Sequence, residues 1–157
     1  MSQSRMQMTL PNEILLEEVG SLLAEGRDVE IMAKGTSMLP FIVGDRDSVI
    51  LKKETDGCPK PGDIVLARRS PGNYVLHRIV GLEGDKVTLK GDGNVSGTET
   101  VSVKDILGKV IAVVGPSGRK RIPENGWLWR RLPPFVRRCV LALYRRTIFR
   151  IIAKNEN

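Results

Sequence analysis

The chain contains one histidine, His77, and this residue narrows the chemistry open to the protein. Histidine is the side chain that ordinarily changes charge near neutral pH, so His77 is the natural candidate for a general base. Three histidines for a zinc site are not available, and the two cysteines, Cys58 and Cys139, form no C-x-x-C pattern. We therefore expect neither a metal nor an organic cofactor. A lone histidine on a strand can also be purely structural. The neighbouring sequence must therefore show whether His77 has a chemical role.

Ser37 is the candidate nucleophile. It lies in the turn 35–40, with the sequence GTSMLP, directly after an alternating segment that is typical of a strand. A serine in such a turn can present its hydroxyl group away from the sheet, with backbone amides nearby to stabilise an oxyanion. We assign the oxyanion and substrate-binding positions to Gly35, Thr36 and Met38. An isolated turn serine is usually an ordinary turn residue, so this assignment depends on the rest of the sequence.

Four short motifs in a fixed order connect Ser37 and His77 to a known family. They are the turn 35–40 with Gly44 and Asp45, the strand 62–65 (GDIV), the segment 77–85 (HRIVGLEGD) and the loop 91–94 (GDGN). In type and order they resemble the motifs of type I signal peptidases and LexA-like serine peptidases. The resemblance covers roughly residues 29–114, about half of the chain. Histidine in the position of the base is similar to the endoplasmic-reticulum and archaeal branch, which uses Ser-His rather than Ser-Lys.

The resemblance implies a catalytic Ser37–His77 dyad with Asp92 as the carboxylate that orients the imidazole. The eukaryotic branch has a second aspartate six residues further on; here that position is Thr98, beside Glu99. Three outcomes follow: Asp92 acts alone, Glu99 substitutes for the missing acid, or the enzyme is slow.

The elements that must position these residues are mainly strands. Alternation and turn residues predict strands at residues 29–33, 48–52, 63–68, 74–80, 86–90 and 107–114. Because neighbouring strand residues point to opposite faces, Arg78 faces away from His77 and is expected to form a structural ion pair. One helix is predicted between Asn12 and Gly26, and another from residue 134 to about 153.

We expect a mainly β fold: a signal-peptidase-like (LexA-like) β core with an N-terminal helix and a C-terminal basic amphipathic helix. The expected division is an N-terminal segment at 1–27, a peptidase-like domain at 28–115, and a linker with the basic helix at 116–157. Residues 115–118 (GPSG) have the composition of the linker.

The net charge of +7 arises in the C-terminal part of the chain. Residues 119–157 contain 11 Lys and Arg against two acids, whereas residues 1–118 contain 14 against 16. On a helix, one face collects apolar side chains, namely Val140, Leu141, Tyr144, Ile148, Ile151 and Ile152. The other face collects basic ones, namely Arg138, Arg145, Arg146, Arg150 and Lys154. Since the family motifs end by about Val114, we expect residues 126–157 to be dispensable for cleavage of a short soluble peptide.

Three interpretations of the basic helix remain open: contact with an anionic membrane, docking on the β domain or a partner protein, and nucleic-acid binding. The third is disfavoured because no helix-turn-helix precedes the peptidase-like region. The longest apolar run, residues 139–144, has six residues, far fewer than the roughly 20 of a membrane-spanning helix. The polar N-terminus predicts neither a signal peptide nor the anchor of signal peptidases. We expect a cytoplasmic protein, with or without peripheral contact with the membrane.

The sequence thus predicts a serine endopeptidase, a hydrolase that cleaves an extended segment of a peptide or precursor protein through an acyl-enzyme. Two alternatives stand beside it. One is a non-catalytic peptide- or protein-binding module on the same fold. The other is a self-cleaving LexA-like regulator with a nucleic-acid-binding basic tail. The sequence gives no indication of the oligomeric state.

Overall fold

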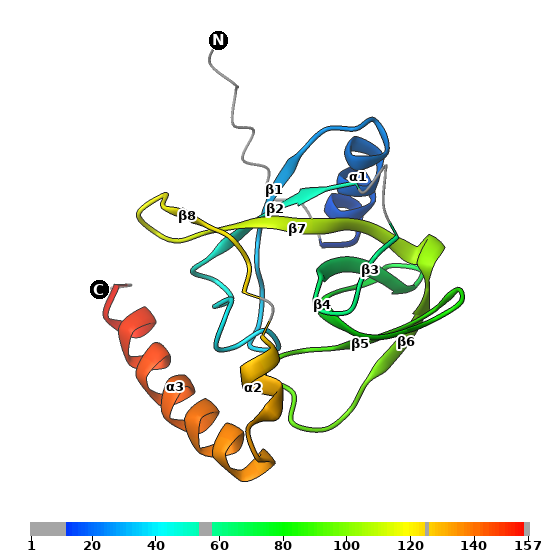
Figure 1. The fold of residues 1–157 in the computed structure, drawn as a ribbon. Helices are drawn as coiled ribbons and strands as arrows, with labels where there is room; N and C mark the ends of the chain where they lie inside the picture. The colour runs from blue at the N-terminus through cyan, green and yellow to red at the C-terminus, as the bar shows by residue number, and fades with distance from the viewer. Residues whose placement is uncertain (1–11, 54–57, 125, 156–157) are drawn as a thin grey trace.

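The computed structural model describes residues 12–53, 58–124 and 126–155, and they form a predominantly β structure (Figure 1). Eight antiparallel strands make one sheet in the order β1-β2-β7-β3-β4-β5-β6, with β8 paired to β7 off this path. The strands are β1 (Val29–Met32), β2 (Ser48–Lys52), β3 (Ile64–Ser70), β4 (Asn73–Glu83), β5 (Lys86–Lys90), β6 (Glu99–Ser102), β7 (Ile106–Val114) and β8 (Lys120–Arg121). The helices are α1 (Asn12–Ala24), the 3₁₀ turn η1 (Val103–Asp105), α2 (Trp127–Arg131) and α3 (Pro134–Asn155). The predicted mainly β class with terminal helices is confirmed.

The central hairpin β3–β4 carries the candidate base. Val65 pairs with His77 and Ile64 pairs with Arg78 across this hairpin. β4 continues beyond its predicted end at residue 80, because a register shift after Ile79 lets the strand bend and keep pairing with β5. The β4–β5 hairpin then leads into the loop 91–94, so that the candidate base and the last family motif lie on connected elements.

Two clusters of aliphatic side chains hold the sheet together. One lies beneath α1 and contains Leu23, Val49, Leu51 and Val113, each completely buried. The other lies between β3, β4 and β5 and contains Ala67, Ile79, Val87 and Leu89. Burying one such side chain stabilises the fold by about 1.5–3 kcal/mol, so these clusters fix the strands that carry the site.

Residues 115–118 form a hairpin turn between β7 and β8, so the prediction of a linker there is wrong. The Gly118 N–H donates to the Gly115 carbonyl at 2.9 Å, and Val114 pairs with Lys120 across the turn. A glycine- and proline-rich composition is common to linkers and to tight turns, and only the pairing of the flanking residues separates the two.

The C-terminal helices pack on the segment that follows Ser37. Leu39 and Val43 are buried against Trp129 of α2 and Leu141 of α3, with Tyr144 and Ile148 packed against this cluster. Figure 1 shows α3, coloured orange to red, at the end of the molecule opposite α1. The segment after residue 115 is therefore part of the folded body. None of the helices in the described ranges is long and apolar enough to cross a membrane.

Candidate active site

The imidazole of His77 is held by a carboxylate. His77 lies in the middle of β4 with 6 % of its surface exposed, and its Nδ1 is 2.9 Å from Oε2 of Glu99, the first residue of β6. The other carboxylate oxygen of Glu99, Oε1, lies 3.1 Å from Nη1 of Arg69 on β3. With the Nδ1–H donating to this carboxylate, Nε2 is the nitrogen left to accept a proton. That is the tautomer a general base requires.

The loop 91–94 joins the backbone of Ser37 to the imidazole. The Gly93 N–H donates to the Ser37 carbonyl oxygen at 2.8 Å. A Cβ placed on Gly91 would lie 2.5 Å from the same Ser37 oxygen and 3.1 Å from Nε2 of His77. Ser37 and Nε2 therefore flank the same point on Gly91, and any side chain there would collide with both. The predicted dyad residues are neighbours across this glycine.

The turn that carries Ser37 is shaped by two glycines. Gly35 has a φ of +72°, a left-handed conformation that L side chains rarely adopt. A Cβ on Gly44 would lie 2.0 Å from the Gly35 carbonyl oxygen, so the two backbones touch. Gly35 and Thr36 are exposed and Ser37 is half-buried, which leaves all three open to a ligand. Met38 is 4 % exposed within the cluster beneath α1. Its predicted substrate-binding role is therefore limited to its backbone, because its side chain anchors the turn to the core.

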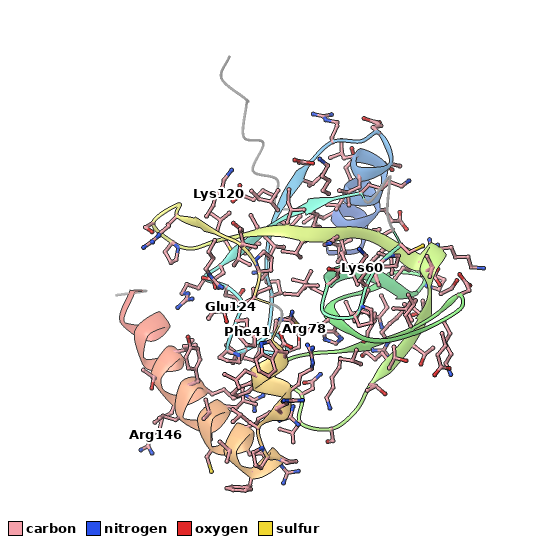
Figure 2. The ribbon with its side chains drawn as sticks, viewed as in Figure 1. Phe41, Lys60, Arg78, Lys120, Glu124 and Arg146 are labelled. Carbon is pink, nitrogen blue, oxygen red and sulfur yellow. The ribbon has the colours of Figure 1, made fainter. Side chains whose placement is uncertain are left out.

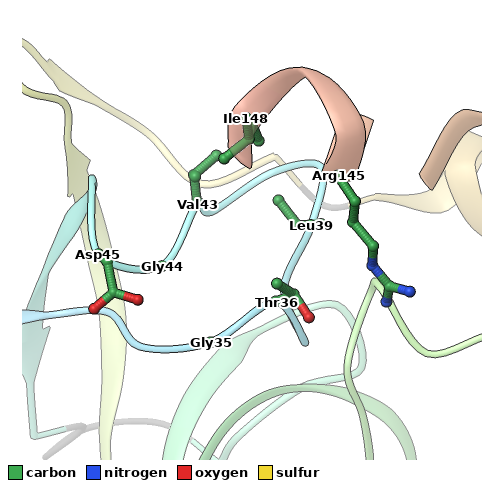
Figure 3. A pocket seen from close by; sticks show the side chains of 8 residues that line it. All are labelled: Gly35, Thr36, Leu39, Val43, Gly44, Asp45, Arg145 and Ile148. Carbon is green, nitrogen blue, oxygen red and sulfur yellow. The ribbon is translucent and has the colours of Figure 1, made fainter. Parts of the chain in front are cut away.

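Two cavities lie near the candidate residues, one against the turn that carries Ser37 and one against His77. The first, of about 190 Å³, is lined by Gly35, Thr36, Leu39, Val43, Gly44, Asp45, Arg145 and Ile148 (Figure 3). The second, of about 120 Å³, is lined by His77, Leu89, Lys90, Gly91, Asn94, Gly97, Thr98 and Glu99. Sequence reasoning missed the contribution of α3 to the first cavity. Arg145 and Ile148 come from a helix that follows the last family motif, and no local pattern connects them to Ser37.

Asp92 has a different partner from the one predicted. The Nε of Arg78 donates to Oδ1 of Asp92 at 2.9 Å, and Nη2 donates to Oδ2 at 2.7 Å, with both side chains buried. His77 and Arg78 face opposite sides of β4, and Asp92 lies on the side of Arg78. The expectation that Asp92 orients the imidazole is corrected: Glu99 does so. The prediction of an ion pair for Arg78 is confirmed.

The Nη1 group of Arg78 bridges the turn before β3 and the C-terminal segment. Its Nη1 donates to the carbonyl oxygens of Gly62 at 2.8 Å and Glu124 at 2.7 Å. Its guanidinium lies 5.5 Å from the centre of the Phe41 ring, and Figure 2 shows these groups together between the sheet and α2. The indole N–H of Trp129 donates to the carbonyl oxygen of Asp92 at 2.8 Å.

Arg78 and Trp129 therefore fasten Glu124 and α2 to the loop 91–94, whose Gly93 N–H in turn binds the Ser37 carbonyl. Nearby, burial lowers the pKa of Arg130 from its ordinary value and the positive charge of Arg78 lowers it further, with a partial offset from Asp92. Three of the acceptors in this region are backbone carbonyl oxygens, those of Gly62, Glu124 and Asp92. Every residue has such an oxygen, so the sequence could not predict these three hydrogen bonds.

In the described ranges, no group of three or more His, Cys, Asp or Glu side chains is placed to hold a metal ion. Comparison of the chain with protein-family models and with curated proteins gave no match.

Proposed function

We propose that the protein is a signal-peptidase-like serine endopeptidase that acts through Ser37, His77 and Glu99. The observation that carries this proposal is the geometry of the imidazole. Its Nδ1 is bound by Glu99 at 2.9 Å, and its Nε2 and the Ser37 backbone flank the same point on Gly91. Triad serine hydrolases place a hydroxyl beside an imidazole and the imidazole against a carboxylate, because each group activates or orients the next. Here the imidazole is bound to the carboxylate directly, and the backbone of Ser37 lies beside Nε2.

In the proposed reaction, Ser37, His77 and Glu99 have one task each. The hydroxyl oxygen of Ser37 attacks a peptide carbonyl while its proton passes to Nε2 of His77, and the carboxylate of Glu99 stabilises the resulting imidazolium. Backbone amides of the turn 35–40 stabilise the oxyanion. His77 then donates its proton to the leaving amine, which gives an acyl-enzyme, and water activated by the same imidazole releases the acid. Proton transfer of this type contributes about 10²–10⁴-fold to the rate.

The substrate is an extended peptide that pairs with β1. β1 is the end strand of the sheet path and leads directly into the turn that carries Ser37. An extended segment added to such an edge gains backbone hydrogen bonds, and alternate side chains can enter pockets. The cavity lined by Gly35, Thr36 and Leu39 is in reach of a residue next to the cleaved bond. Small residues before that bond are implied by the family resemblance.

The proposal is tested by incubating the full chain with a mixture of extended peptides and identifying new termini by mass spectrometry. We expect cleavage by the wild type and by Ser96→Ala, a control at an exposed serine near the site. Ser37→Ala and His77→Ala should each abolish cleavage. The double variant should be no worse than either single variant, because the two residues act as a unit. Cleavage retained by His77→Ala would contradict the proposed base.

The same experiment separates the two alternatives. A peptide-binding module would retain peptides on the immobilised protein without producing new termini. A self-cleaving regulator would shorten the wild-type chain over time and leave Ser37→Ala intact. Specific cleavage of added peptides supports the endopeptidase over both.

A further inference from the structure

Large apolar side chains are exposed mainly in one short stretch of the chain. Of the eight large apolar side chains that are exposed in the described ranges, six lie between residues 122 and 143. They are Ile122, Trp127, Leu128, Phe135, Val140 and Leu143. Exposed apolar groups gathered in this way usually mark a surface that contacts something else.

α3 is apolar on two sides, and the apolar face expected from the sequence is partly occupied, as docking on the β domain requires. Leu141, Tyr144 and Ile148 pack against the body of the protein. Phe135 and Leu143 project into the opposite half of the helix and are 68 % and 69 % exposed. Phe135 and Leu143 therefore mark an outer side of α3 that is left for a partner, and Trp127 and Leu128 of the adjoining α2 are exposed as well. These four exposed side chains are called the outer face below.

The charge of the same segment indicates the partner. The sequence from Trp127 to Asn155 contains seven Arg, one Lys and no acid. Arg131, Arg138 and Arg146 are exposed, and the guanidinium of Arg131 lies 5.4 Å from the centre of the Trp127 ring. A nucleic acid would satisfy the charges and leave the apolar groups in water, and a second copy of this face would repel the first. An anionic lipid bilayer accommodates both, with tryptophan and arginine at the headgroups.

We propose that the outer face of α2 and α3 rests on an anionic lipid surface. This proposal does not depend on peptidase activity. α3 also supplies Arg145 and Ile148 to the cavity beside the Ser37 turn. The candidate active site would then lie about one helix diameter, roughly 10 Å, from the lipid headgroups.

The test measures co-flotation of the full chain with vesicles of equal parts phosphatidylglycerol and phosphatidylcholine. Wild-type protein should float with these vesicles and not with pure phosphatidylcholine, and added salt should weaken binding by screening. Arg138→Gln with Arg146→Gln should lower affinity by about fivefold for each arginine. Phe135→Ser with Leu143→Ser should lower it by about tenfold or more. Met32→Ser, at an exposed apolar residue of β1, is the matched control and should bind as the wild type does.

All substituted residues are exposed, so circular dichroism should show an unchanged fold in each variant. Equal flotation of the Phe135→Ser, Leu143→Ser variant and the wild type would overturn the proposal, because charge alone would then explain binding. Equal flotation with pure phosphatidylcholine would do the same. A third outcome would also overturn the proposal: the wild type binds no vesicles but is a dimer by light scattering, and Phe135→Ser with Leu143→Ser abolishes the dimer. The outer face would then bind a second copy of the chain.

Discussion

At the scale of single residues, the two carboxylates near β4 have separate tasks. Glu99 binds His77, whereas Asp92 binds Arg78. The sequence offered both as partners of the imidazole and favoured Asp92, because Asp92 occupies the family motif. The alternation of β4 already implied that two neighbouring residues face opposite sides. The sequence could not show which carboxylate lies on which side, since that depends on how β6 folds back beside β5.

Substituting each carboxylate by its amide separates these tasks. Glu99→Gln should lower kcat/KM by two or more orders of magnitude, because a neutral amide no longer stabilises the imidazolium or enforces its tautomer. Its free energy of unfolding should change by about 1 kcal/mol or less, since the pair is partly exposed. Asp92→Asn should instead destabilise the protein by about 3–5 kcal/mol, because it leaves the charge of Arg78 buried without a partner. Peptide cleavage and urea denaturation measure the two effects, and the reverse pattern would restore Asp92 as the orienting residue.

At the scale of elements, strands with regular alternation were predicted well because the signal is local. β2 and β5 have the predicted bounds, and α1 begins at the predicted Asn12. The sequence did not predict β6, because only one of its four residues, Val101, is a buried apolar residue, which is too few for an alternating pattern. Its pairing with β5 identifies it as a strand. The two-residue β8 gives no periodic signal at all.

The loop 91–94 should tolerate no side chain at Gly91. Gly91→Ala would place a methyl group 2.5 Å from the Ser37 carbonyl oxygen and 3.1 Å from Nε2 of His77, so Ser37 and His77 would be forced apart. We expect a loss of cleavage of about 100-fold or more, since small displacements of reacting groups are costly. Gly20→Ala, in the middle of α1, is the control. Its Cβ would lie 3.6 Å from the side chain of Leu107, an ordinary contact distance, so the activity should be unchanged. An active Gly91→Ala protein would contradict the contact that joins the dyad.

Trp129 should act as a positioning residue for Ser37. Trp129→Phe keeps an aromatic ring but removes the N–H that fixes the Asp92 carbonyl. We expect a lower kcat with little change in KM, and a loss of stability of only about 1 kcal/mol. Leu141→Ala serves for comparison, because it removes an apolar contact from the same cluster without touching the loop. It should cost about 2–5 kcal/mol and leave kcat per folded molecule unchanged. If both variants lose kcat only in proportion to unfolding, Trp129 has no positioning role.

At the scale of the whole molecule, the C-terminal segment belongs to the body that the sequence motifs define. The sequence predicted that it is dispensable for cleavage, because the motifs end by about Val114. In the structure, Arg78 donates to the Glu124 carbonyl, and Leu39 and Val43 are buried against α2 and α3. Such contacts join residues far apart in the chain through backbone acceptors and packing, so a sequence pattern cannot reveal them.

Removing residues 122–157 should therefore destabilise the protein. The truncation exposes Leu39 and Val43 and takes one acceptor from the buried guanidinium of Arg78. We expect a lower midpoint of urea denaturation and a loss of cleavage that exceeds the unfolded fraction. A truncated chain with the stability and activity of the full protein would show that α2 and α3 are an appendage, as the sequence suggested.

The central claim, that Ser37 is a nucleophile activated by His77, is tested most directly by the site of reaction with a fluorophosphonate. The full chain is treated with the reagent and digested, and the modified residue is identified by mass spectrometry. We predict a single adduct on Ser37, absent from Ser37→Ala, strongly reduced in His77→Ala and retained in Ser96→Ala. An unmodified wild-type chain, or an adduct of equal yield in His77→Ala, would contradict the account.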